Sequence, residues 1–297
     1  MYASAWLKYH FPAAFACALL ANQPMGFYSP LSLVSDARRH GVRVRGVDVN
    51  ASGARPGLEP YRGPTPAPPL TAGRPQPAIR LGLETVRGIG TPQAEAIVAG
   101  QPYAGLEDFA RRTGLPAPVL EALATAGAFD CFGLTRRQAL WSAGAFAGIS
   151  AELLPGTTPG TEAPELPGMS PVEETIADLW ATGTSATSHP LQHLRAHLER
   201  GGALSAAQLP DVPAGRAVVV GGLVTHRQRP PTAGGVLFLS LEDETGLIKV
   251  ICNRPVWESQ RRTALDRAGL LVHGHIERDR GATNLIATRL TPLRIGL

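Results

Sequence analysis

The last third of the chain alternates between apolar and polar positions in a pattern that predicts a closed β-barrel. Five strand-like runs cover 217–231, 236–241, 247–252, 269–277 and 282–290. One helix-like segment, 255–265, lies between the third run and the fourth. Three strands, a helix and two strands is the order of the OB-fold, a small barrel that commonly binds single-stranded nucleic acid on one face. We therefore expect a five-stranded OB-fold over residues 213–297.

The second strand of this barrel separates an inner from an outer face. Alternate positions are leucines that are expected to fill the barrel: Leu237, Leu239 and Leu241. The positions between them, Val236, Phe238 and Ser240, are then expected to face outward. An outward aromatic ring on this strand is where a base would stack, at about 1–3 kcal/mol per base. The alternative interpretation leaves Phe238 in the core.

The turn that follows, EDETG, contains three acids in succession, Glu242, Asp243 and Glu244. On a hairpin turn, they are better explained as turn residues than as metal ligands. Gly246 is expected to supply the positive φ that a tight hairpin needs.

Charge favours a nucleic-acid partner for the barrel. Residues 213–297 carry 12 Lys and Arg against 7 Asp and Glu. The candidate contacts for the nucleic-acid phosphate backbone are Arg227 and Arg229, at the end of the first strand, and Lys249, in the third. The alternative is a solvated rim around a structural or protein-binding barrel, because a fold alone does not fix a function.

The first 50 residues are dominated by helical signals. Helices are expected over 2–8, 12–21 and 30–40, the third with Ser29 as its N-cap and Gly41 just past its end. The run VRVRGVDV predicts a short strand. Arg38 and Arg39 lie in the last turn of the third helix, where they either complement the helix dipole or contact a phosphate.

The segment YASAWLKYHFPAAFACALLANQPMGFYSPLSLVSDARRHGVRVRGVDVN closely resembles the fingers region of the bacterial C-family DNA polymerases, the DNA polymerase III alpha subunits. QPMGFYSP and DARRHGV resemble most the error-prone, damage-inducible branch of this family. The resemblance covers nearly the whole chain. It implies a C-terminal fragment in which residues 1–50 are the end of the fingers. It also implies that the palm, with three metal-binding aspartates, lies upstream of this chain.

The segment IRLGLETVRGIGTPQAEAIVAG predicts a helix, a tight GIG turn and a second helix, with Thr91 as N-cap and Pro92 as the first helical residue. Glycines at 88 and 90 allow the protein backbone to approach DNA closely and to direct its N–H groups at a phosphate. Such a contact does not depend on the base sequence of the DNA. The candidate DNA contacts here are Arg87, Gly88, Ile89, Gly90 and Thr91. The alternative is an ordinary αα-hairpin whose glycines serve only close packing.

A looser second copy of this hairpin spans 113–130, with Gly114, Leu115 and Pro116 at its turn. Two such hairpins resemble the tandem helix-hairpin-helix module, which grips duplex DNA and follows the fingers in the polymerase III alpha subunits. We expect the module over 79–147, where Thr135 caps a further helix and Trp141 lies in the core.

Two linkers are expected on composition. Residues 51–78 hold eight prolines and little periodicity. Residues 148–212 begin with a Pro/Gly/Thr/Glu-rich stretch and continue with two helices, the first opened by a capping box at Ser170. Histidines 189, 193 and 197 fall four apart in this region, but no carboxylate or distant ligand accompanies them, so no metal site is predicted.

The whole composition agrees with an intracellular, DNA-binding protein. The net charge is +4, and the three cysteines show no CxxC spacing, which indicates a reducing, cytoplasmic location. No run of 18 apolar residues occurs, so no membrane partner is expected. The overall prediction is a multidomain α+β chain, mostly helical in its N-terminal half.

The resemblance implies a parent DNA-directed DNA polymerase, a nucleotidyltransferase acting in DNA replication and in the repair of DNA damage by translesion synthesis. Magnesium is expected for the full-length enzyme and no cofactor for this chain, which lacks the palm carboxylates. We expect no catalytic residue here, and binding of primer–template duplex and single-stranded template. The alternative function is a non-catalytic scaffold that recruits a sliding clamp or accessory mutagenesis proteins. An RNA-binding OB protein is a third hypothesis, against which the glycine hairpin argues.

Overall fold

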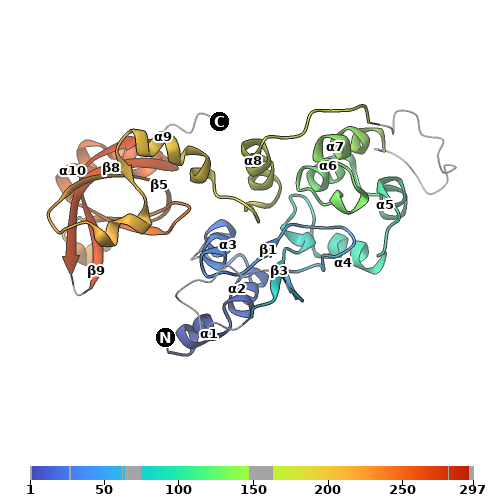
Figure 1. Cartoon of the computed structure of the whole chain (residues 1–297), viewed down its shortest axis with the longest axis horizontal. Helices are drawn as coiled ribbons and strands as arrows, with labels where there is room; N and C mark the ends of the chain where they lie inside the picture. The colour runs from blue at the N-terminus through green and yellow to red at the C-terminus, as the bar shows by residue number, and fades with distance from the viewer. Residues whose placement is uncertain are drawn as a thin grey trace. The chain divides into compact units, whose positions relative to one another are not determined.

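The computed structural model describes residues 2–26, 28–61, 63, 75–146, 163–279 and 281–293, which form two compact units, Met1–Thr187 and Ser188–Leu297 (Figure 1). The helices of the first unit are α1 Tyr2–His10, α2 Pro12–Ala21, α3 Pro30–Arg39, α4 Thr91–Ala99, α5 Leu106–Thr113, α6 Ala117–Thr125, α7 Arg136–Ala145 and α8 Pro171–Thr182. The helical N-terminal half expected from the sequence is therefore confirmed.

Local capping signals fix several of these helix ends. Ser29 Oγ accepts a hydrogen bond from the backbone N–H of Ser32 at 3.1 Å, and Gly41 has φ +75° just beyond α3. At the start of α7, the hydroxyl of Thr135 and the side chain of Gln138 form the reciprocal pair of a capping box. These ends agree with the sequence because caps depend on neighbouring residues.

The segment expected to be a linker, 51–78, instead contributes to a small sheet. Strands β1 Val44–Arg45, β2 Gly57–Glu59 and β3 Ala78–Arg80 pair in the order β1-β3-β2, with β1 parallel and β2 antiparallel to β3. The Glu59 carboxylate of β2 forms two ion pairs, from Oε1 to Arg45 Nε at 2.8 Å and from Oε2 to Arg80 Nε at 3.0 Å. Because these partners are distant in sequence, proline content alone could not reveal the strand. Residues 62 and 64–74 of the expected linker lie outside the described residues.

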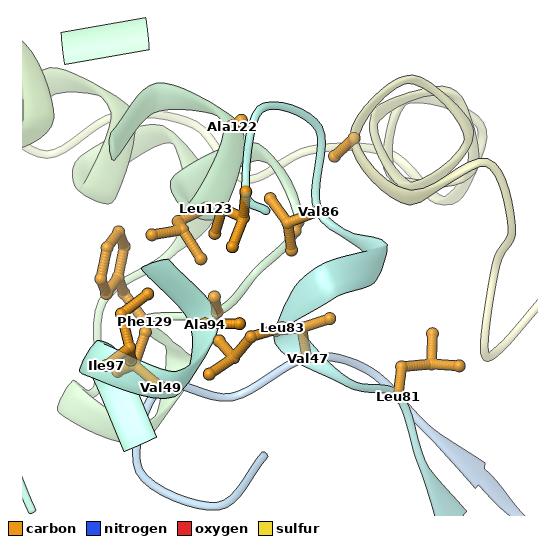
Figure 2. Close-up of a cluster of buried hydrophobic side chains, with 14 of the residues drawn as sticks. Val47, Val49, Leu81, Leu83, Val86, Ala94, Ile97, Ala122, Leu123 and Phe129 are labelled. Atoms are coloured by element: carbon orange, nitrogen blue, oxygen red, sulfur yellow. The ribbon is translucent and has the colours of Figure 1, made fainter. Parts of the chain in front are cut away.

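The core of the first unit joins this sheet to the helices that follow it. Figure 2 shows Leu81 and Leu83, which follow β3, with Ile97 of α4 and Leu123 of α6. Phe129 lies in the same cluster, and its ring centroid is 5.2 Å from that of Phe109 in an edge-on contact. Trp141, expected in the core, is instead 53% exposed on α7, because the buried positions of that helix are small residues.

The second unit contains the expected five-stranded barrel. Its strands are β5 Ala217–Gln228, β6 Leu237–Glu242, β7 Leu247–Cys252, β8 Gly269–Asp279 and β9 Ala282–Pro292. They pair in the order β5-β6-β7-β9-β8, and β5 also pairs with β8, which closes the barrel. The β7–β9 pair is parallel, whereas the other four pairs of the barrel are antiparallel. This is the OB-fold arrangement.

The helix of the barrel differs from expectation. The helix predicted between the third and fourth strands is divided into α10 Arg254–Ser259 and α11 Arg261–Asp266, with Gln260 between them. The Gln260 side chain accepts the backbone N–H of Leu290 in β9 at 2.7 Å, so this break is tied to the barrel wall.

The second unit also includes residues before 213 that were expected to be a linker. These include a 3₁₀ helix, Pro190–Leu194, and then α9 Arg195–Arg200 and β4 Ala203–Leu204, which pairs in parallel with β5. Leu209 is 5% exposed and packs into the barrel core. Apolar positions at 204 and 209 are too widely spaced to signal a strand or helix, which explains the error. The other expected linker helix, α8, packs in the first unit, and 147–162 lies outside the described residues.

Candidate nucleic-acid interface

The GIG turn of the first hairpin is exposed and is anchored by the apolar residues that flank it. Val86 and Ile89 are buried, whereas Gly88, Gly90 and Thr91 are exposed. Ile89 donates its N–H to the carbonyl of Val86 at 3.1 Å, which closes the turn. The glycine bend therefore faces solvent with its backbone accessible, as phosphate binding requires.

The two glycines have different roles. Gly88 has φ +83°, in the left-handed region that favours glycine, and an added Cβ would lie 3.4 Å from Val119 Cγ2 of α6. Gly90 has φ −93°, which any residue can adopt, and it is the N-cap of α4, a role expected for Thr91. Pro92 is consequently the second helical residue. The chain before the turn is β3 and one 3₁₀ turn, Leu83–Thr85, in place of the expected helix.

Backbone donors gather at this turn. The Gly90 N–H donates to Gln93 Oε1 at 3.2 Å. Within the described part of the chain, the amides of Gly88 and Thr91 have no hydrogen-bond acceptor, and both residues are exposed. Amides at a glycine turn that leads into the positive end of a helix form a site for an anion such as a DNA phosphate.

The second hairpin, α5–α6, has the expected shape but fewer donors. Gly114 ends α5 with φ +59°, so the turn forms as the sequence indicates. Pro116 is the N-cap of α6 and Pro118 its second residue. Because proline has no backbone N–H, this turn has lost amides at two positions. The first hairpin is consequently the better equipped of the two for phosphate binding.

Arg87 is the basic residue adjacent to the GIG turn. Its guanidinium carbon lies 5.1 Å from the ring centroid of Trp180 in α8, and its backbone N–H donates to the carbonyl of Ala181 at 2.7 Å. Arg87 is exposed beside the turn.

The side chains of Arg38 and Arg39 contact other residues of the first unit. Arg38 Nη2 donates to the carbonyl of Thr187, and burial, followed by the nearby charges of Arg43 and Arg39, lowers the pKa of Arg38. Arg39 Nη2 lies 3.9 Å from Asp36 Oδ1, and its side chain is 18% exposed. These contacts favour the structural interpretation of the two arginines over phosphate binding.

The barrel presents a continuous outer strip across four strands, which we term the barrel platform. The inner leucines of β6 are buried, as expected, whereas Phe238 is 36% exposed. Strand register places outward residues in two rows: His226, Ser240, Lys249 and Asn284 in one, and Gln228, Phe238, Ile251 and Ile286 in the other. An aromatic ring beside a lysine, with polar and aliphatic neighbours, can stack a base and attract its phosphate.

The sequence alone indicated only Phe238, Ser240 and Lys249 of this platform by residue. The other members required the register, since the period-two pattern gives the face of each residue but not its neighbour on the next strand.

The two arginines expected at the end of β5 have separate environments. Arg227 Nε donates to the carbonyl of Ala264 at 2.8 Å, and Arg227 Nη2 donates to the carbonyl of Arg267. Burial lowers the pKa of Arg227. Arg227 therefore ties β5 to the end of α11, while Arg229 is exposed, with its guanidinium carbon 5.3 Å from the Trp257 ring centroid.

The acidic turn of the barrel is structural. Asp243 Oδ1 accepts the N–H groups of Thr245 and Gly246 at 2.8 and 2.9 Å, and Gly246 does not have a positive φ. The hairpin is thus closed by the Asp243 side chain rather than by a left-handed glycine. Arg195 pairs with Asp243 and Glu244. In the described residues, no group of three or more His, Cys, Asp or Glu could hold a metal ion.

Two family matches coincide with these two sites. Residues 41–139 match the family described as "Helix-hairpin-helix motif", and residues 218–293 match "OB-fold nucleic acid binding domain". Over nearly its whole length, the chain also resembles proteins named "Error-prone DNA polymerase". It is 50% identical to that of Mycolicibacterium paratuberculosis, covering 97% of this chain and 25% of the relative.

The chain is homologous to the bacterial error-prone DNA polymerases. The polymerase of Nocardia farcinica is 48% identical over 99% of this chain and 26% of its own length, and that of Corynebacterium glutamicum is 43% identical over 100% and 26%. The chain therefore spans about a quarter of these error-prone polymerases and corresponds to their C-terminal part. The resemblance expected from QPMGFYSP and DARRHGV is confirmed.

Solved structures resemble the chain only weakly. The asparaginyl-tRNA synthetase from Pyrococcus horikoshii has 20% sequence identity and a TM-score of 0.27, covering 30% of this chain and 22% of the synthetase. No helix in the described part of the chain is long and apolar enough to cross a membrane.

Proposed function

We propose that this chain is the DNA-gripping part of an error-prone, translesion DNA polymerase that works in the cytoplasm on damaged DNA. The first hairpin holds duplex phosphates, and the barrel platform holds the single-stranded template. The observation that carries the proposal is the exposed GIG turn, with Gly88 at φ +83° and with amides at Gly88 and Thr91 that have no acceptor among the described residues. Binding of this kind is salt-dependent and largely independent of sequence.

The chain alone does not polymerise DNA under this proposal. Magnesium would serve the parent enzyme by stabilising the attacking and leaving oxygens of the phosphoryl transfer. The acids clustered here do not fit that role, because Asp243 is fully buried and both it and Glu244 are paired with Arg195. The ligands for magnesium would lie in the preceding part of the parent protein.

Fluorescence anisotropy with labelled duplex, single-stranded and primer–template DNA tests this proposal. The Gly88→Ala/Gly90→Ala double variant should weaken duplex binding, and Phe238→Ala should weaken single-strand binding, each with little effect on the other substrate. Unchanged affinity in both variants would remove the assigned contacts. Primer extension with magnesium and nucleotides tests the inactivity of the chain, and extension by the purified chain would contradict it.

A second candidate function is a protein-binding scaffold that recruits a sliding clamp or accessory mutagenesis proteins. The observation that favours it is α1, in which no residue is buried and Tyr2, Trp6 and Tyr9 are 82%, 43% and 48% exposed. Titration with purified clamp would test it: binding that is lost in Trp6→Ala while DNA binding is kept would support the scaffold, and no binding would remove it.

A further inference from the structure

Helix α8 lies outside both matched segments, 41–139 and 218–293, yet it contacts the residue that precedes the GIG turn. The Arg87 backbone N–H donates to the carbonyl of Ala181 at 2.7 Å. The Arg87 guanidinium carbon lies 5.1 Å from the ring centroid of Trp180. Two neighbouring residues near the end of α8 thus hold the backbone and the side chain of Arg87.

Helix α8 is itself held firmly against the helical bundle. Arg136 Nη1 of α7 lies 2.7 Å from Asp178 Oδ1, and these side chains are only 17% and 10% exposed. Asp178 Oδ2 also accepts the hydroxyl of Ser185 at 2.6 Å. At the other end, the Ser170 hydroxyl caps the helix. Trp180 therefore projects from a fixed support rather than from a loose linker.

Stacking on an indole differs from ion pairing in its effect on an arginine. Arg111, Arg112 and Arg136 are each paired with a carboxylate, which offsets their charge. Arg87 has no ion pair within the described residues, and its partner is the uncharged ring of Trp180, which is 48% exposed. A ring that covers the face of a guanidinium leaves the charge and the N–H edge available for a phosphate.

We propose that Trp180 is a positioning residue for DNA, which holds the Arg87 guanidinium beside the GIG turn so that both bind the duplex backbone. Helix α8 then belongs to the duplex-binding site although it lies beyond the matched hairpin segment. This inference rests on the proposed function of the first hairpin as a duplex-binding element.

The test uses the full chain, a labelled duplex and a series of salt concentrations. Arg87→Ala should lower the slope of log affinity against log salt by about 0.9, the value for one lost phosphate contact. Trp180→Ala should weaken duplex binding by about 2- to 5-fold and lower the same slope. Trp180→Ala should have no further effect in the Arg87→Ala background, because both changes disrupt one contact.

The structure offers three companion variants. Trp141→Ala removes another exposed tryptophan, 53% exposed on α7, and should leave affinity and salt slope unchanged. Trp180→Leu keeps an apolar side chain but removes the aromatic face, so it should lower the slope as Trp180→Ala does, even if Trp180→Ala is destabilised. Trp180→Phe should recover part of the affinity.

The outcomes separate this inference from the function on which it rests. If the chain does not bind duplex, or binds it equally well with Gly88→Ala/Gly90→Ala, the proposed function fails. If those variants behave as proposed but Trp180→Leu keeps the unaltered salt slope, or Trp180→Ala adds its full effect to Arg87→Ala, only the role of Trp180 is overturned.

Discussion

Arg195 and Asp243 form a largely buried ion pair, with Arg195 Nη2 2.9 Å from Asp243 Oδ2 and the Asp243 side chain fully buried. The same carboxylate closes the β6–β7 hairpin and accepts the N–H of Ala206 at 2.8 Å. One buried side chain therefore joins the barrel to the segment that precedes it.

Loss of this carboxylate should destabilise the second unit. Asp243→Ala leaves the amides of Thr245 and Gly246 without their acceptor, while Arg195 keeps Glu244 as a carboxylate partner, so we expect a loss of about 1–3 kcal/mol in the free energy of unfolding. Urea denaturation of the chain measures this loss. Glu258→Ala, which breaks the exposed pair with Arg254, is the matched control and should change stability by about 0–1 kcal/mol.

The two glycines of the GIG turn should respond differently to alanine. Gly88→Ala forces a Cβ into a φ of +83° and should cost more than about 1 kcal/mol of stability, together with duplex affinity. Gly90→Ala keeps a φ that alanine adopts, at an exposed N-cap, and should cost only a few tenths of a kcal/mol up to about 1 kcal/mol. Thermal unfolding and duplex anisotropy on the two single variants check this order. Equal effects would contradict it.

Phe238→Ala should weaken binding of single-stranded DNA by about 1–3 kcal/mol, because one stacked base loses its ring. Leu265→Ala removes another exposed apolar side chain of the second unit, 37% exposed on α11 and outside the barrel platform, and should have no effect. Anisotropy with a short single strand is the measurement. A similar loss in both variants would show that exposed apolar area, rather than the platform, decides affinity.

Lys249→Ala should change the salt dependence of single-strand binding. Loss of one phosphate contact on a single strand lowers the slope of log affinity against log salt by about 0.7. Lys249 lies beside Ser240 and Asn284 on the barrel platform. Titrations at several salt concentrations give the slope, and an unaltered slope would remove Lys249 from the contact.

Cys252 should make stability fall at high pH. Burial raises the pKa of this thiol to about 11, above the usual value of 9.0. Between these values, the unfolded chain releases the proton while the folded chain keeps it, so stability is lost as pH rises through that range. Urea midpoints measured from pH 8 to 11 should decline more for the unaltered chain than for Cys252→Ala. Equal declines would contradict the assignment to this thiol.

The sequence predicted the barrel well because its signals are local. The alternation of Leu237, Leu239 and Leu241 fixed the inner face of β6, and the capping residues Ser29, Thr135 and Ser170 marked helix starts. The error at the small sheet concerns long-range contacts, because nothing near Glu59 in the sequence indicates its pairing with Arg45 and Arg80. The error at Gly246 is local: the turn is closed by the side chain of Asp243 in the same EDETG segment, and not by a left-handed glycine.

The candidate site was predicted less completely than the fold. The GIG turn could be recognised from its two glycines. In contrast, the hydrogen bonds from Arg38 to the carbonyl of Thr187 and from Arg227 to the carbonyl of Ala264 join residues that are far apart in the chain. Trp180 gave no signal at all, because its partner, Arg87, is 93 positions earlier and outside its helix.

The closure of the barrel by β8 and β9 also sets the order in which the protein can fold. Strand β9 pairs with both β7 and β8. Strand β5 pairs with β6 along one edge, and its other edge stays unpaired until β8 has been made. During synthesis, the second unit cannot complete its core until residues up to Pro292 have been made, whereas the helical unit has all its residues by Thr187. The nascent chain would thus acquire a folded helical unit before its OB-fold barrel is complete.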